Sequence, residues 1–243
     1  GPATFNVTGG SLTVAGTTVK ATENDTQGTQ GGLIIGYNES GAVNISGGSV
    51  TVGRYVSVGL DNTNDAIDNV PGATATLNIS GTGALAITHA TNLSSTVFVG
   101  NGVPGSVNIS DSGSLIATST GVGLQVGVTS PASYTQTGGT TTMTGGVSVG
   151  LNTVADASLA LSGNTSFNVG GALTIGSGSA TGTTWTIADN THVSVGTNGA
   201  NNVFIGRGTT SNTTFNMTGG TLDITKYFLM GTAAAGTSTA TNI

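Results

Sequence analysis

Residues 43–52 decide the fold, and they read Val43-Asn44-Ile45-Ser46-Gly47-Gly48-Ser49-Val50-Thr51-Val52. Two short segments alternate apolar and polar residues, and a Gly-Gly pair separates them. Alternation with a period of two is typical of strands with one buried face, and glycine pairs are typical of tight turns. The stretch therefore predicts two short strands joined by a sharp corner.

The same phrase recurs along the whole chain. Anchored on its second residue, the copies lie at positions 6, 44, 78, 108, 135, 160, 186 and 216, so that successive copies are 25 to 38 residues apart. A third apolar segment closed by glycine follows each copy, as in Ile35-Gly36, Val58-Gly59 and Val99-Gly100. The chain is thus built from eight copies of a three-strand unit, with insertions of variable length.

A unit of three short strands cannot bury its apolar face alone, so neighbouring units must stack. We therefore predict an all-β fold, a parallel β-helix (β-solenoid) with about eight coils of three strands and with the insertions at the corners. One domain, residues 1–243, is expected, with coils beginning near residues 4, 42, 75, 106, 133, 158, 183 and 213 and a ninth near 240. The side chains expected to face inward are Val43, Ile45, Val50, Val52, Leu77, Ile79, Val107 and Ile109. A β-sandwich also has alternating strands, but it gives no reason for eight copies of one phrase.

Composition narrows the class of protein further. Of 243 residues, 42 are Gly, 6% are charged and none is Cys, which excludes disulfides and thiol catalysis. The four basic residues are scattered at Lys20, Arg54, Arg207 and Lys226, so no basic stripe for nucleic acid exists. No apolar run approaches the ~20 residues of a transmembrane helix, so no transmembrane segment is expected.

The repeated phrase, Asn44 to Val52 followed by Val58-Gly59, resembles the β-strand repeats of autotransporter passengers and related exported bacterial proteins. These include proteins with sorting tails of the PEP-CTERM kind. The resemblance covers nearly the whole chain and rests on a low-complexity motif. It implies an extracellular or cell-surface location, and it implies nothing finer about function.

Parallel β-helices include polysaccharide lyases and hydrolases, so catalytic chemistry has to be considered. Glycoside hydrolysis needs two carboxylates across one bond, and most of the ten acidic residues lie in turns or insertions. Asp223 and Lys226 form one acid–base pair near a strand, while His89 and His192 have no Ser/Asp partner pattern. We therefore expect no catalytic residues and no enzyme activity. A polysaccharide-active enzyme is the least favoured alternative.

The densest acidic stretch runs from residue 61 to residue 69 and contains Asp61, Asp65 and Asp68. Oxygen ligands at such spacing suit Ca²⁺. The stretch lacks the glycine and glutamate of a helix-flanked calcium loop, and the Gly-Gly-x-Gly-x-Asp repeat of calcium-binding β-rolls is missing. No metal and no cofactor are expected, and these three aspartates are the candidate ligands to test.

Five asparagines share one position of the repeat: Asn6, Asn44, Asn78, Asn108 and Asn216. Their apolar neighbours are expected to face inward, which leaves the Asn side chains outward. Stacked Asn amides can hydrogen-bond along the rod as a ladder. All five are also Asn-x-Ser/Thr sequons, so the sequence leaves glycosylation open.

The two ends of the chain bear on assembly. Thr241-Asn242-Ile243 repeats the opening of the first strand, and Asn242 is expected to stack on Asn216 as the start of a ninth coil. Gly1-Pro2 is either a native start or a scar of tag removal. Open coils present unpaired backbone groups that invite another strand. Two explanations stay open: head-to-tail polymerisation, or a segment of a longer solenoid.

These features predict a structural extracellular protein whose main partner is itself. We expect a self-assembling filament or surface-layer subunit that stacks through its open ends. The expected interface residues are Phe5, Asn6, Val7, Thr241, Asn242 and Ile243. The alternative is a surface adhesin or fibre segment that binds a host or matrix polysaccharide or protein through its corner loops.

Overall fold

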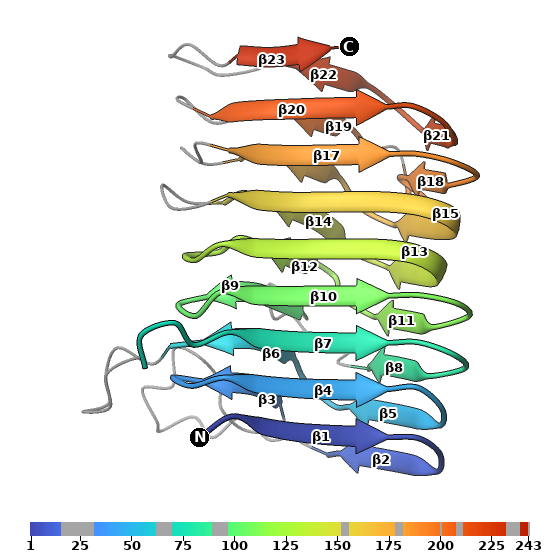
Figure 1. Ribbon diagram of the computed structural model, residues 1–243. Coiled ribbons are helices and arrows are strands. Elements are labelled where there is room, and N and C mark those ends of the chain that lie inside the picture. Colours follow the sequence, from blue (N-terminus) through green and yellow to red (C-terminus); the bar gives the residue numbers. More distant parts are fainter. Residues whose placement is uncertain are drawn as a thin grey trace.

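The computed structural model describes residues 1–15, 32–61, 70–88, 97–151, 156–177, 182–199, 201–207 and 211–231, and the backbone of residues 239–242. These residues form 23 strands and no helix. The strands wind into a β-solenoid, which confirms the predicted fold class. Figure 1 shows the strands stacked along the rod, with β1 near one end and β23 at the other.

Each coil has a first, a second and a third side. The first-side strands are β1 (Ala3–Val7), β4 (Gly41–Ile45), β7 (Ala75–Ile79), β10 (Gly105–Ile109), β17 (Thr183–Ile187), β20 (Asn212–Met217) and β23 (Thr239–Asn242). The second-side strands are β2 (Ser11–Val14), β5 (Ser49–Val52), β8 (Ala84–Ile87), β11 (Ser114–Ala117), β18 (His192–Val195) and β21 (Thr221–Ile224). The third-side strands are β3 (Leu33–Tyr37), β6 (Val56–Leu60), β9 (Val97–Asn101), β12 (Val122–Val126), β14 (Gly146–Val149), β16 (Leu173–Ile175), β19 (Val203–Ile205) and β22 (Phe228–Met230).

Two long strands, β13 (Ala132–Met143) and β15 (Ala157–Val169), run through the corner between the first and second sides. Three separate strands per coil were expected, so the unbroken corner is a departure from the prediction. The register between these two strands shifts after Gln136, where the chain bends. Because they are continuous, the first and second sides form one 15-stranded sheet, and the third side forms a separate eight-stranded sheet.

All strand pairs within the sheets are parallel, and equivalent residues of successive coils pair in register. Val43, for example, pairs with Phe5 on one side and with Leu77 on the other. This is the pairing that a repeated sequence phrase dictates, because each unit places the same side chain at the same point of the coil. The apolar columns that result fill a narrow core between the sides.

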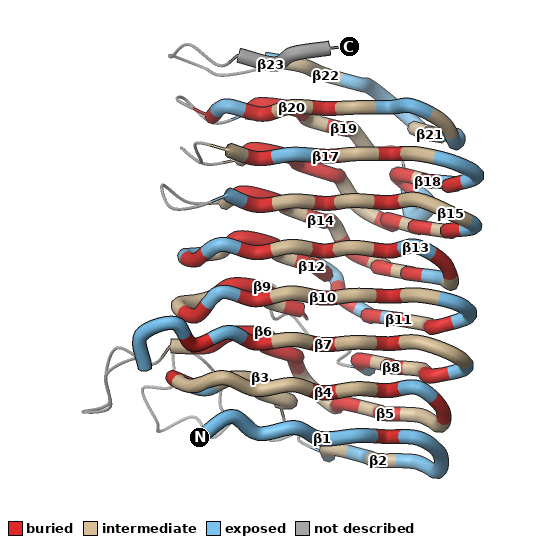
Figure 2. The backbone as a smooth tube through the Cα atoms, in the orientation of Figure 1, coloured by how far each residue is buried: buried red, intermediate tan, exposed pale blue. Residues whose placement is uncertain are grey.

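Burial follows the alternation of the sequence. All eight side chains predicted to face inward are buried, with exposures from 0% for Ile45 and Ile79 to 6% for Val43, so this prediction is confirmed. Figure 2 shows buried and less buried positions alternating along the strands of the middle coils. The inward position holds larger side chains in the later coils, where Trp185 and Phe167 are fully buried.

The number of coils needs a small correction, because the solenoid has about six turns and the repeat spacing predicted eight. Every unit does contribute one strand to the eight-stranded sheet. At the two ends, however, a coil has a neighbour on one side only. Four of the five residues of β1 are exposed, and no residue of β21 is buried. The number of coils enclosed on both sides is therefore smaller than the number of sequence repeats.

The corner between the first and second sides depends on glycine. Gly48 has a φ of 76°, a conformation that residues with a side chain rarely adopt. A Cβ atom at Gly48 would also lie 2.4 Å from the carbonyl oxygen of Gly10 in the preceding coil. Both the turn and the close stacking of coils thus require the Gly-Gly pair of the repeated phrase.

Candidate functional site: the outer ladder, the end coils and two surface hollows

Four of the five repeated asparagines form a hydrogen-bonded ladder on the outside of the first side. Asn44 Nδ2 donates to Asn6 Oδ1 at 2.7 Å, and Asn78 Nδ2 donates to Asn44 Oδ1 at 2.7 Å. Asn108 Nδ2 donates to Asn78 Oδ1 at 2.8 Å. Each bond runs from a later coil to the preceding one, so the ladder has a polarity along the rod.

Asn216 is not joined to this ladder. The three intervening first-side strands carry Thr135, Ala160 and Thr186 at the equivalent position. Asn216 Oδ1 is buried and has no hydrogen-bond partner in the described structure. A buried amide oxygen without a donor is unfavourable by about 1–3 kcal/mol. The amide oxygen of Asn202 is in the same state.

The three residues of the first coil that were predicted to form an interface differ in solvent exposure. Phe5 is 47% exposed although its position in the repeat faces inward, Asn6 is exposed, and Val7 is 6% exposed. Among the described strands this coil pairs with the second one, through β1–β4, β2–β5 and β3–β6. No described strand pairs with the other edge of β1, β2 or β3.

The opposite end differs from the expectation. Strand β23 pairs with β20, but Thr241 lies opposite Thr214, and Asn242 lies opposite Phe215. The expected stacking of Asn242 on Asn216 is therefore wrong by one residue, and a shift of one residue exchanges the two faces of a strand. Ile243 lies outside the described residues.

Apolar side chains are exposed at this end as well. Met217 and Phe228 are each 39% exposed, and Tyr227 is 58% exposed. Phe228 packs against Phe215 with ring centroids 5.7 Å apart, and Phe215 lies 4.5 Å from Trp185. An aromatic column thus runs from the core to the exposed end of the rod.

The residues considered as catalytic candidates have other partners than the sequence predicts. His192, which was thought to lack an acidic partner, has its Nε2 atom 2.8 Å from Asp223 Oδ2, so that reading was wrong. The two side chains are 50% and 65% exposed, on the outer face of β18 and β21. Lys226, which the sequence paired with Asp223, places its Nζ atom 5.5 Å from the ring centroid of Tyr227. His89 lies outside the described residues.

The calcium candidates are only partly described. Asp61 follows β6, and its backbone N–H donates to the carbonyl oxygen of Asn101 in the next coil. Asp65 and Asp68 lie outside the described residues. Among the described residues, no group of three or more His, Cys, Asp or Glu side chains could hold a metal ion.

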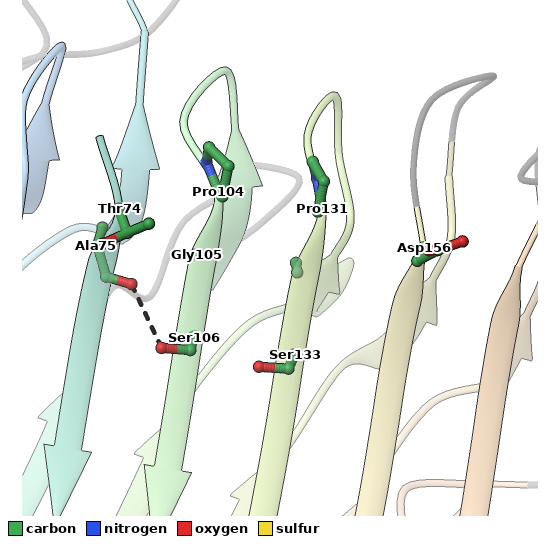
Figure 3. Close-up of a pocket in the computed structure, with 9 residues that line it drawn as sticks. Thr74, Ala75, Pro104, Gly105, Ser106, Pro131, Ser133 and Asp156 are labelled. Atoms are coloured by element: carbon green, nitrogen blue, oxygen red, sulfur yellow. Dashed lines mark hydrogen bonds between the residues drawn. The ribbon is translucent and has the colours of Figure 1, made fainter. Parts of the chain in front are cut away.

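A shallow hollow of about 310 Å³ lies where the chain enters the first side (Figure 3). Pro104 and Pro131 follow one another on successive coils, and Asp156 lies on the coil after them. Ser106 Oγ donates to the carbonyl oxygen of Ala75 at 3.4 Å. The lining offers a single carboxylate, whereas glycoside hydrolysis uses a pair.

A second, more polar hollow of about 520 Å³ lies at the corner that leads to the third side. Its lining includes five glycines and the side chains of Asn198 and Asn201. Asn198 Nδ2 donates to the carbonyl oxygen of Thr144, and Asn201 Nδ2 donates to that of Gly170. Asn201 therefore bonds its coil to the preceding one, and Asn198 bonds to the coil two before its own.

A buried polar cluster in the fifth coil was not predicted. The Tyr134 hydroxyl lies 2.6 Å from Thr141 Oγ1, which donates to Gln136 Oε1 at 2.9 Å. All three residues are fully buried. Burial raises the pKa of the Tyr134 hydroxyl well above its usual value, and the hydrogen bond to Thr141 only partly offsets this rise. The sequence feature that could have indicated this cluster is Gln136, a polar residue at a position that holds Ile109 and Leu161 in the neighbouring coils.

Comparison with known proteins adds no relative. No protein-family model, no curated protein and no solved structure matches the chain. In the described part of the chain, no helix has the length and apolar character needed to cross a membrane.

Proposed function

We propose that this protein is a structural, extracellular β-solenoid subunit that assembles end to end with further copies of itself, as a filament or surface-layer component. The observation that carries the proposal is the state of the two end coils. Among the described strands, β1, β2 and β3 each pair with a neighbour on one edge only, and apolar side chains are exposed at both ends of the rod.

Such edges favour strand addition. An unpaired edge offers a row of N–H and C=O groups to a further strand, and exposed apolar side chains gain stability when another coil covers them. Parallel stacking continues the pairing that already holds each coil to the next. The extracellular location rests on the resemblance of the repeats to those of exported bacterial proteins.

Electron microscopy and sedimentation velocity over a range of protein concentrations test this proposal. We expect unbranched fibres that lengthen with concentration. Phe5→Asp places a charge on an exposed end and should shorten or abolish the fibres. Ile116→Asp is the matched control, because Ile116 is 44% exposed on the middle strand β11 and should leave fibres intact.

Single short rods at every concentration would refute end-to-end assembly. If such rods bind a matrix polysaccharide or protein, the adhesin alternative takes its place. Its corner loops include the stretches 16–31, 62–69 and 89–96, which lie outside the described residues.

A further inference from the structure

We infer that the first coil stacks directly on the eighth coil of a second copy, with Asn6 opposite Asn216 and with β1 in the place of β23. This inference rests on the proposed function and specifies its junction. Three observations carry it: the glycines of the first corner, the polarity of the Asn ladder and the aromatic column. The pairing of β23 with β20 sets what must move for the junction to form.

Among the described residues of one copy, no contact and no backbone angle requires glycine at position 9. The φ of Gly9 is not positive, and a Cβ atom added to it would meet no atom within 4 Å. At the equivalent Gly47, an added Cβ would lie 2.6 Å from the carbonyl oxygen of Thr8 in the preceding coil. In corners of this length the need for glycine at this position therefore arises from a coil beneath it, and beneath Gly9 the described structure has none.

The eighth coil fits beneath the first one. Its corner, Gly219-Gly220, matches Gly9-Gly10, and the φ angles of Gly220 and Gly10 are 75° and 74°. In the register proposed, Gly9 would lie over Thr218 of the second copy as Gly47 lies over Thr8. The corners of the two copies would then stack as the corners within one copy do.

The Asn ladder points to the same register. Every bond of the ladder is donated by a later coil to the coil before it. Asn6 begins the ladder, and its Nδ2 group donates to no Asn of a preceding coil. Asn216 Oδ1 is buried without a donor. Stacking places the Asn6 amide against this oxygen with the polarity of the existing bonds.

The apolar columns match as well. Phe5 would cover Phe215 and extend the column that Trp185 and Phe215 begin. The half-exposed Met217 would be covered by Val7, and Phe228 by Leu33 of the third side. Phe5, Met217 and Phe228 are three of the large apolar side chains that a single copy exposes.

Strand β23 occupies the edge of β20 that this junction needs. It adds a ninth strand to the first side, but the second and third sides end with β21 and β22 in the described structure. If β1 of the second copy paired with β23, a gap one strand wide would remain on those two sides. Continuous stacking on all three sides therefore requires β23 to leave β20.

Two substitutions of glycine test the junction. Gly9→Ala should keep the melting temperature of the single rod, because its Cβ meets open space, but it should raise the critical concentration for fibres at least about tenfold. Gly47→Ala is the matched control that should lower the melting temperature of the rod itself. Fibres of Gly9→Ala that form as readily as those of the parent would overturn the inference.

Engineered cysteines report the register independently, since the chain has no cysteine of its own. Thr4→Cys with Thr214→Cys should form disulfides between copies in mild oxidant, because paired positions of neighbouring strands lie ~4.8 Å apart and within disulfide reach. Thr4→Cys with Thr241→Cys should not. Efficient cross-linking of the second pair alone would show that β23 stays and would overturn this register while leaving end-to-end assembly standing. A parent chain that forms no fibres would instead refute the proposed function.

Discussion

At the scale of single residues, Tyr134 is a fully buried side chain with a titratable hydroxyl. Burial raises its pKa in the folded state, whereas the unfolded chain should titrate near ~10. The folded state then keeps its proton while the unfolded state loses it. The stabilising contribution of Tyr134 is complete below pH ~10 and falls by about 1.4 kcal/mol per pH unit above it.

We therefore expect the free energy of unfolding to decrease steeply between pH ~10 and pH ~11.5. Tyr134→Phe should flatten this decrease, because it removes the buried hydroxyl. Denaturant titrations across this pH range measure the slope. An equal slope for Tyr134→Phe and the parent would contradict the prediction.

At the scale of elements, the Asn ladder joins four neighbouring strands of the first side. Asn78 donates one of these bonds and accepts another. Asn78→Ala removes both and should lower the free energy of unfolding by about 1–2 kcal/mol. Asn168→Ala is the control, because in the described structure its Nδ2 group donates to Ser166 Oγ of the same strand and to no other coil. This substitution should cost no more than about 0.5 kcal/mol. Equal losses for the two variants would show that the ladder adds nothing between coils.

The strands and their inward faces could be predicted because each coil repeats one local pattern. The alternation around Val43 and Ile45 is read from neighbours in the sequence, and the parallel stacking follows from the repeat. Features that depend on contacts across a corner were missed. Gln136 meets Thr141 only after the chain has bent through β13, and His192 meets Asp223 only between coils.

The candidate site shows the same limit. The sequence gives five equivalent asparagines, and it cannot tell that the bonds among the first four have one direction or that Asn216 Oδ1 has no donor. Nor does it fix the register of β23, whose Thr-rich stretch fits β20 in more than one alignment. A strand at the edge of a sheet has one neighbour to set its register, whereas an interior strand has two.

At the scale of the whole molecule, the net charge of −6 and the composition of the ends set the response of assembly to salt. The residues that would meet at the junction include the apolar Phe5 and Phe228 and the neutral amide of Asn6. The eighth coil carries Asp223 and Lys226 as well. The ion pair of the Gly1 amino group with Glu39 and the hydrogen bond between His192 and Asp223 are both made within one copy. Few ion pairs are therefore available to a junction between copies.

We expect that raising NaCl from ~0.01 M to ~1 M, which shortens the Debye length from ~30 Å to ~3 Å, does not weaken end-to-end association. Screening of the repulsion between negatively charged copies should strengthen it slightly. Light scattering at matched protein concentrations measures this. A junction held by charged groups would instead dissociate steeply with salt, so a loss of association greater than about tenfold would contradict a junction built from backbone pairing and apolar stacking.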